Sequence, residues 1–159
     1  MKIFTKKQTS GGPAPGDVER TVACFKDGLN CTQAVLSTYG PHYGLDREQA
    51  LKVAGAFGSG MGMGETCGAV TGALMVIGLK HTRVKGGGLF SKERTRDLTR
   101  EFTARFKARN KTTMCRELLG CDPGTEEGVK TAQKEKHFKK RCPTFVQEAA
   151  EILEEILTE

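Results

Sequence analysis

Four of the six cysteines lie where the local sequence predicts the start of a helix, a position that favours thiol chemistry. Asn30 and Gln33 have the types and spacing of a capping box, which places Cys31 in the first helical turn. Backbone N–H groups at a helix start carry partial positive charge, so a thiolate is stabilised there. The pattern therefore favours a chemical role for this cysteine.

The other three cysteines of this set show the same signal. A threonine precedes Cys67 directly and Cys115 by two residues, and threonine is a good N-cap residue. Pro143 suits the first position of a helix, so Cys142 is predicted to be the cap. We expect all four cysteines to lie within a first helical turn.

One helix start alone stabilises a thiolate by only about 0.3–1 kcal/mol, which is less than one pKa unit. If several helix starts converge, their fields add, but the thiolates also repel one another. Such a cluster is stable as disulfides, as partly protonated thiols, or around a metal ion or iron–sulfur cluster. The alternative is that these cysteines are small buried hydrophobic side chains.

The cysteine spacing excludes the common local motifs. The sequence contains no Cys-x-x-Cys, which excludes the usual zinc ribbon and the thioredoxin-type dithiol. No apolar region follows the basic residues at the start of the sequence, so we expect no signal peptide and a cytoplasmic location. Six cysteines in a reducing cytoplasm indicate metal binding, catalysis or redox switching. A site must be assembled from distant segments, and we expect Cys31, Cys67, Cys115 and Cys142 to converge in space.

The elements that must position these cysteines are helices. Helical periodicity runs along the chain and strand-like alternation is missing, so the sequence predicts an all-α fold, a compact multi-helix bundle in one domain. Residues 1–15 are expected to be a flexible lead-in, and residues 16–159 the helical domain. The most apolar segment, residues 73–79, is too short to span a membrane. The first predicted helix occupies residues 17–27. Further helices are predicted to start at Cys31, after the cap Asp46, at Cys67 and at Ser91. A short helix includes Cys115, and the last helix runs from Cys142 to the end of the sequence.

Glycines surround Cys67. A glycine-alternating loop, residues 58–64, leads into its helix, and Gly68, Gly72 and Gly78 should let another backbone or a ligand approach closely. The loop lacks the spacing of the known phosphate-binding motifs, so we do not expect a nucleotide site.

Positive charge is concentrated in the second half of the chain. Of the net charge of +6, residues 80–111 hold eleven Lys or Arg against three acidic residues, a local net charge of +8. Nucleic-acid binding is a rival function, because basic helices contact phosphates. However, no known nucleic-acid motif is present, and Leu98, Phe102 and Phe106 form an apolar stripe that should pack on the core. We therefore expect an acidic redox partner protein and no membrane partner.

The segments 28–35, 64–73, 115–120 and 142–143 resemble, in order, the C_GCAxxG_C_C family of redox-active proteins. The resemblance extends over about residues 20–157. It implies an all-helical redox protein in which four cysteines are shared and two glycines complete the central motif as candidate cofactor-binding positions. The shared residues are Cys31, Cys67, Cys115 and Cys142, with Gly68 and Gly72.

We therefore expect a small cytoplasmic protein that transfers electrons. It is either a thiol-based oxidoreductase with Cys67 as the attacking thiol, or an electron carrier whose four shared cysteines ligate an iron–sulfur cluster or metal ion. The alternative is a basic nucleic-acid-binding helical protein with structural cysteines. Cys24 and Cys121 lie outside the shared pattern. The histidines, at positions 42, 81 and 137, are not at ligand spacing and are expected to be ordinary loop or surface residues.

Overall fold

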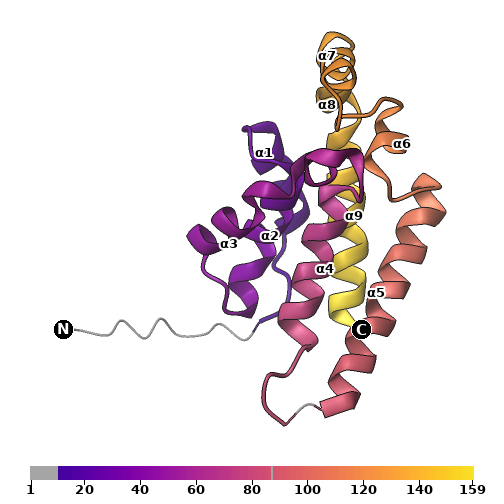
Figure 1. Cartoon of the computed structure of the whole chain (residues 1–159). Coiled ribbons are helices and arrows are strands. Elements are labelled where there is room, and N and C mark those ends of the chain that lie inside the picture. The colour runs from indigo at the N-terminus through magenta and orange to yellow at the C-terminus, as the bar shows by residue number, and fades with distance from the viewer. Residues whose placement is uncertain (1–10, 87) are drawn as a thin grey trace.

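The computed structural model describes residues 11–86 and 88–159, and within these ranges the chain is a bundle of helices without a named strand (Figure 1). Helices α4, α9 and α5 run side by side, α1 to α3 pack on one flank, and α6 to α8 gather at one end (Figure 1). The predicted all-α fold is confirmed. Most of the expected lead-in, residues 1–10, lies outside the described residues.

The helix bounds agree with most of the predicted starts. Asp46 caps α3 as expected, because its carboxylate accepts a hydrogen bond from the backbone N–H of Gln49 at 2.9 Å. The helices are α1 (Asp17–Lys26), α2 (Cys31–Tyr39), α3 (Arg47–Val53), α4 (Gly68–His81), α5 (Gly88–Asn110), α6 (Cys115–Leu119), α7 (Glu126–Lys134), α8 (His137–Lys140) and α9 (Cys142–Thr158). Short turns of other helix types occupy Gly40–Tyr43, Ala54–Ala56 and Gly60–Gly64.

The predicted start of the long basic helix at Ser91 is wrong, because α5 already begins at Gly88. The Ser91 hydroxyl has another task. It accepts a hydrogen bond from the backbone N–H of Arg83 at 2.8 Å and donates one to the carbonyl of His81 at 2.9 Å. Ser91 therefore fastens the connection between α4 and α5 instead of capping a helix.

The core lies between α2, α4, α5 and α9. The predicted stripe of α5 is confirmed, since Leu98, Phe102 and Phe106 are fully buried and the two phenylalanine rings stack with their centroids 6.3 Å apart. Helix α9 contributes a long apolar face to the same core, comprising Val146, Ala149, Ala150, Ile152, Leu153, Ile156 and Leu157. In the described part of the chain, no helix is both long and apolar enough to cross a bilayer.

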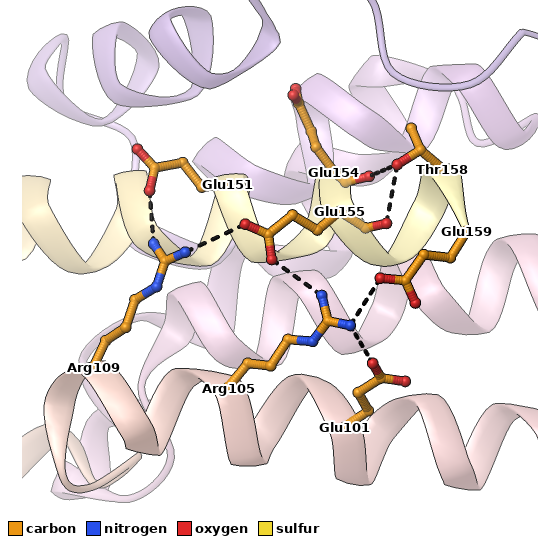
Figure 2. Close-up of polar contacts among 8 residues, drawn as sticks. All are labelled: Glu101, Arg105, Arg109, Glu151, Glu154, Glu155, Thr158 and Glu159. Carbon is orange, nitrogen blue, oxygen red and sulfur yellow. Dashed lines mark hydrogen bonds and ion pairs between the residues drawn. The ribbon is translucent and has the colours of Figure 1, made fainter.

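Two arginines of α5 are bound by the acidic face of α9 (Figure 2). Arg109 pairs with Glu151 at 2.7 Å and with Glu155 at 3.4 Å. Arg105 pairs with Glu155 at 3.1 Å and Glu159 at 2.8 Å, and also contacts Glu101 on its own helix. Each exposed pair contributes little alone, but a shared network fixes the two helices against each other. The positive charge of α5 is thus partly neutralised within the molecule.

Helices α2 and α4 approach each other closely at two glycines. A Cβ atom at Gly72 would lie 3.0 Å from Cβ of Val35 and 3.1 Å from the carbonyl oxygen of Thr32. A Cβ atom at Gly68 would lie 2.6 Å from the Thr32 hydroxyl and 3.1 Å from Cβ of Cys31. The expected close approach is confirmed at these two positions, and the approaching neighbour is helix α2. At Gly78 no described atom lies within 4 Å of that position.

We predict that Gly72→Ala lowers the free energy of unfolding by about 1–3 kcal/mol, because backbone atoms of α2 cannot move away from the added methyl group. Gly78→Ala is the matched control on the same helix. It has open space and should raise the stability by up to about 1 kcal/mol through helix propensity. Urea unfolding measures both changes, and equal effects of the two substitutions would contradict the tight contact between α2 and α4.

Candidate functional site

Cys31 begins α2, and the predicted capping box is confirmed. The Asn30 side chain accepts a hydrogen bond from the backbone N–H of Gln33 at 2.8 Å, and the Gln33 side chain accepts one from the backbone N–H of Asn30 at 3.1 Å. The amide group of Asn30 also donates to the carbonyls of Ala54 and Gly55, each at 3.2 Å. Asn30 therefore fixes both the start of α2 and the chain that leads towards Cys67.

Cys67 and Cys115 are held beside each other by backbone pairing. The N–H of Cys67 donates to the carbonyl of Thr113 at 2.8 Å, and the N–H of Cys115 donates to the carbonyl of Glu65 at 2.6 Å. Between these bonds lies an isolated antiparallel bridge from Thr66 to the residue before Cys115. The predicted threonine caps are wrong, because these segments pair like short strands. Cys67 itself is the N-cap of α4, and Cys115 is the first residue of α6.

Cys142 is the first residue of α9, and the expectation that it is the cap is wrong by one position. Arg141 is the N-cap and Pro143 the second helical residue. The Arg141 guanidinium donates to the carbonyl of Leu119 at 3.0 Å, which ties the start of α9 to the end of α6. All four cysteines nevertheless lie at helix starts, as predicted.

These four cysteines line one small cavity, and their predicted convergence is confirmed. The cavity measures about 20 Å³, which is room for about one water molecule. Cys67, Cys115 and Cys142 are buried, Cys31 is partly buried, and all six cysteines of the chain are free thiols. The remaining wall is mostly apolar and consists of Ser59, Gly68, Leu118, Leu119, Phe138 and Phe145. We call this space the cysteine cavity.

The thiols in the cysteine cavity differ in acidity. A hydrogen bond from Cys31 and bonds from the backbone amides of Ala69 and Val70 lower the pKa of Cys67, although burial opposes them. The pKa of Cys31 is raised well above its usual value by its interactions with the sulfur atoms of Cys142 and Cys67 and by burial. Burial, followed by nearby thiolate charge, raises the pKa of Cys115 to about 12. The arrangement therefore favours the thiolate of Cys67 over those of Cys31 and Cys115.

The candidate cofactor-binding glycines, Gly68 and Gly72, face α2, so protein atoms occupy the space beside them. Across residues 11–86 and 88–159, no group of three or more His, Cys, Asp and Glu side chains is placed to hold a metal ion.

Sequence reasoning missed three side-chain contacts that lie outside the cysteine cavity. His137, expected to be a loop or surface residue, is buried, and its Nδ1 lies 3.6 Å from the sulfur of Cys121. His42 is also engaged, since its Nε2 lies 2.9 Å from a carboxylate oxygen of the buried Asp17. Cys24 lies in α1 near the guanidinium of Arg47, at 3.8 Å. Sequence spacing gives no signal for these contacts, because turns and packing between distant helices create them.

Comparison with known proteins identifies one relationship. A protein-family model described as “Putative redox-active protein (C_GCAxxG_C_C)” matches residues 29–156. No curated protein and no solved structure matches the chain.

We predict that alkylation of Cys67 by iodoacetamide continues to lower pH than alkylation of Cys31 or Cys115, because only Cys67 has hydrogen bonds that favour its thiolate. Trypsin places each of the six cysteines in a different peptide, so mass spectrometry resolves the rates. Burial lowers the alkylation rate of all three thiols. The quantity to compare is therefore the pH at which the rate of each thiol reaches half its maximum. A midpoint for Cys67 at or above that of a free cysteine derivative would contradict the assignment.

Proposed function

The chain belongs to this redox-active family, and from that premise we propose that it transfers electrons by thiol–disulfide exchange in the cysteine cavity. The observation that carries the proposal is the environment of Cys67, whose sulfur receives a hydrogen bond from Cys31 and bonds from two backbone amides. A thiolate is the nucleophile in disulfide exchange, and these donors stabilise it. Cys67 is the attacking thiol in this mechanism, and Cys31 is its partner.

The exchange proceeds in two displacements. The Cys67 thiolate attacks one sulfur of an incoming disulfide, whose other sulfur leaves as a thiolate and takes up a proton. Cys31 then loses its proton and attacks the sulfur of Cys67, which forms a Cys31–Cys67 disulfide and releases the second thiol. Two electrons pass from the two cysteines to the incoming disulfide, which becomes two thiols.

The acidities of the two thiols order these steps. The negative charge of Cys67 is one of the causes that raise the pKa of Cys31. When Cys67 becomes bonded to another sulfur, this charge disappears and Cys31 ionises more readily. Cys31 therefore remains a thiol until a mixed disulfide has formed, and then becomes the resolving nucleophile. We place this chemistry in the cytoplasm, where thiols are kept reduced and can turn over.

The test is mapping of the disulfide that forms on limited oxidation with hydrogen peroxide, a two-electron thiol oxidant little larger than the water molecule that the cavity can hold. We expect a Cys31–Cys67 disulfide in wild-type protein, its absence in Cys67→Ser, and no effect of Cys24→Ser, which changes a thiol outside the cavity. Anaerobic purification with iron and sulfide analysis tests the rival. Stoichiometric iron and sulfide that disappear in Cys67→Ser would favour cluster ligation and contradict thiol exchange.

We further propose that the cations of α5 left free by α9 dock an acidic redox partner protein. Arg105 and Arg109 are engaged by the carboxylates of α9, so the docking charge consists of exposed residues such as Lys92, Arg96 and Lys107. A cationic surface of this kind speeds the encounter with an acidic protein, and salt screens the effect.

Reversal of Arg96 and Lys107 to glutamate should slow reduction of the oxidised protein by an acidic dithiol protein about tenfold at low salt. Lys52→Glu with Lys130→Glu makes the same change in net charge on α3 and α7 and should have little effect. Stopped-flow kinetics at increasing salt measure the rates. Tight, sequence-selective binding of DNA or RNA at physiological salt that the α5 reversal abolishes would instead support the nucleic-acid function.

A further inference from the structure

A cysteine, a histidine and a carboxylate contact one another in turn outside the cysteine cavity. The sulfur of Cys121 is 3.6 Å from Nδ1 of His137, and Nε2 of His137 is 2.7 Å from a carboxylate oxygen of Glu135. The histidine is buried, whereas the carboxylate is exposed and Cys121 is partly exposed. A nucleophile beside a base that a third group orients is an arrangement of nucleophilic catalysis.

The carboxylate determines which nitrogen of the ring faces the thiol as an acceptor. An ionised carboxylate can only accept hydrogen bonds, so the Nε2 atom of His137 must carry the hydrogen that it donates to Glu135. In the neutral imidazole the other nitrogen, Nδ1, then has a free lone pair. This lone pair faces the sulfur of Cys121, so His137 is oriented to accept the thiol proton.

The backbone holds this group in place from both sides. Gly120, with a φ of 73°, ends α6 in the left-handed conformation and turns the chain into Cys121. Lys136, with a φ of 59°, separates Glu135 from His137, and a left-handed non-glycine residue needs support from its surroundings. The turn after Cys121 packs so closely on α7 that a Cβ at Gly128 would lie 1.8 Å from the Asp122 carbonyl oxygen.

Cys121 also adjoins the cysteine cavity. It packs against the cluster formed by Cys115, Leu119 and Cys142, which includes two of the cysteines that line the cavity. Only about 4% of Cys67 is exposed, and the cavity has room for about one water molecule. A disulfide larger than that cannot reach Cys67 from outside, so the disulfide that Cys67 attacks must form within the protein, beside the cavity. Cys121 is partly exposed and packs against two of the cysteines that line the cavity.

We propose that Cys121 is the entry thiol through which an external low-molecular-weight disulfide oxidises the cysteine cavity, with His137 as its general base and Glu135 as a positioning residue. The inference rests on the proposed thiol–disulfide exchange. It adds two groups to the proposed exchange: a fifth cysteine, which is not one of the four that line the cavity, and a general base. The substrate class is a small disulfide such as that of glutathione.

Four displacements transfer the disulfide from the external molecule to Cys31 and Cys67. His137 takes the proton of Cys121, and the resulting thiolate attacks the external disulfide and releases one thiolate, which regains this proton. Cys142 attacks Cys121 and releases the second external thiol. Cys67 attacks Cys142, which frees Cys121, and Cys31 attacks Cys67, which frees Cys142 and leaves a Cys31–Cys67 disulfide. Two protein thiols are oxidised, and one external disulfide is reduced to two thiols.

The electrostatic surroundings explain why Cys121 needs a base. Burial is the largest influence that raises its pKa, and Glu135 adds to the effect. Arg141 acts in the opposite direction, whereas Asp122 and Cys142 raise the pKa further. Cys121 is therefore held as a thiol and reacts by giving its proton to the adjacent imidazole.

The experiment adds glutathione disulfide to reduced protein and follows all six cysteine peptides by mass spectrometry. In wild-type protein we expect a glutathione adduct on Cys121 before an adduct on any other cysteine. In Cys142→Ser this adduct should accumulate. In Cys121→Ser the Cys31–Cys67 disulfide should form at least about tenfold more slowly than in wild type. Cys24→Ser, which changes a thiol outside the cavity, is the control and should match wild type. First reaction at Cys67, or a wild-type rate in Cys121→Ser, would overturn the entry role.

A substitution of Glu135 tests the base while the buried histidine itself stays in place, since the Glu135 side chain is exposed. Glu135→Gln should slow adduct formation on Cys121 about tenfold or more. Nitrogen NMR of the His137 ring should show protonation at Nε2 in wild type and a mixture of tautomers in the variant. An unchanged tautomer with an unchanged rate would overturn the positioning role.

The two proposals fail separately. Hydrogen peroxide is little larger than a water molecule and needs no bulky entry step, so its Cys31–Cys67 product tests the proposed function in wild type and in Cys121→Ser alike. If peroxide gives this disulfide but glutathione disulfide gives it equally fast without Cys121, only the entry role is wrong. If peroxide gives no such disulfide, the proposed function is wrong, and the order of adduct formation still decides the reactivity of Cys121.

Discussion

The close approach of α2 and α4 is the constraint on which the site depends. Two glycines one helical turn apart leave no side chain between the helices, so the backbone of α2 at Thr32 touches α4 directly. The contact brings Cys31, at the start of one helix, against Cys67, at the start of the other. Gly68 and Gly72 thus hold the two sulfur atoms together through packing, because a larger residue at either position would separate the two helix starts.

Around this contact, the remaining cysteines are brought in by backbone and arginine interactions rather than by sulfur chemistry. The paired segments at Glu65–Cys67 and Thr113–Cys115 set the position of Cys115. Arg141 ties the start of α9 to the end of α6 and so positions Cys142. None of these interactions requires a bond between sulfur atoms, and the four cysteines line the cavity without one.

Local signals in the sequence predicted much of this arrangement. The capping box at Asn30, the cap at Asp46 and the apolar stripe of α5 depend on residues three or four positions apart, and all three are confirmed. The convergence of the four cysteines was also predicted, but the particular contacts between distant segments were not. The segments that contain the threonines before Cys67 and Cys115 pair with each other through their backbones. The left-handed backbone conformation of Lys136 brings His137 to Cys121.

The placement of the cysteines at the starts of separate helices links oxidation to folding. A disulfide between Cys31 and Cys67 would close a loop that contains all of α2 and α3, and loops of this size reduce the entropy of the unfolded chain enough to add about 3–5 kcal/mol of stability. By thermodynamic reciprocity, the folded structure would favour the disulfide by the same amount. The packing of two helices at Gly68 and Gly72 would then help to set the reduction potential of the protein, and a change that loosens this contact would make the disulfide a stronger oxidant.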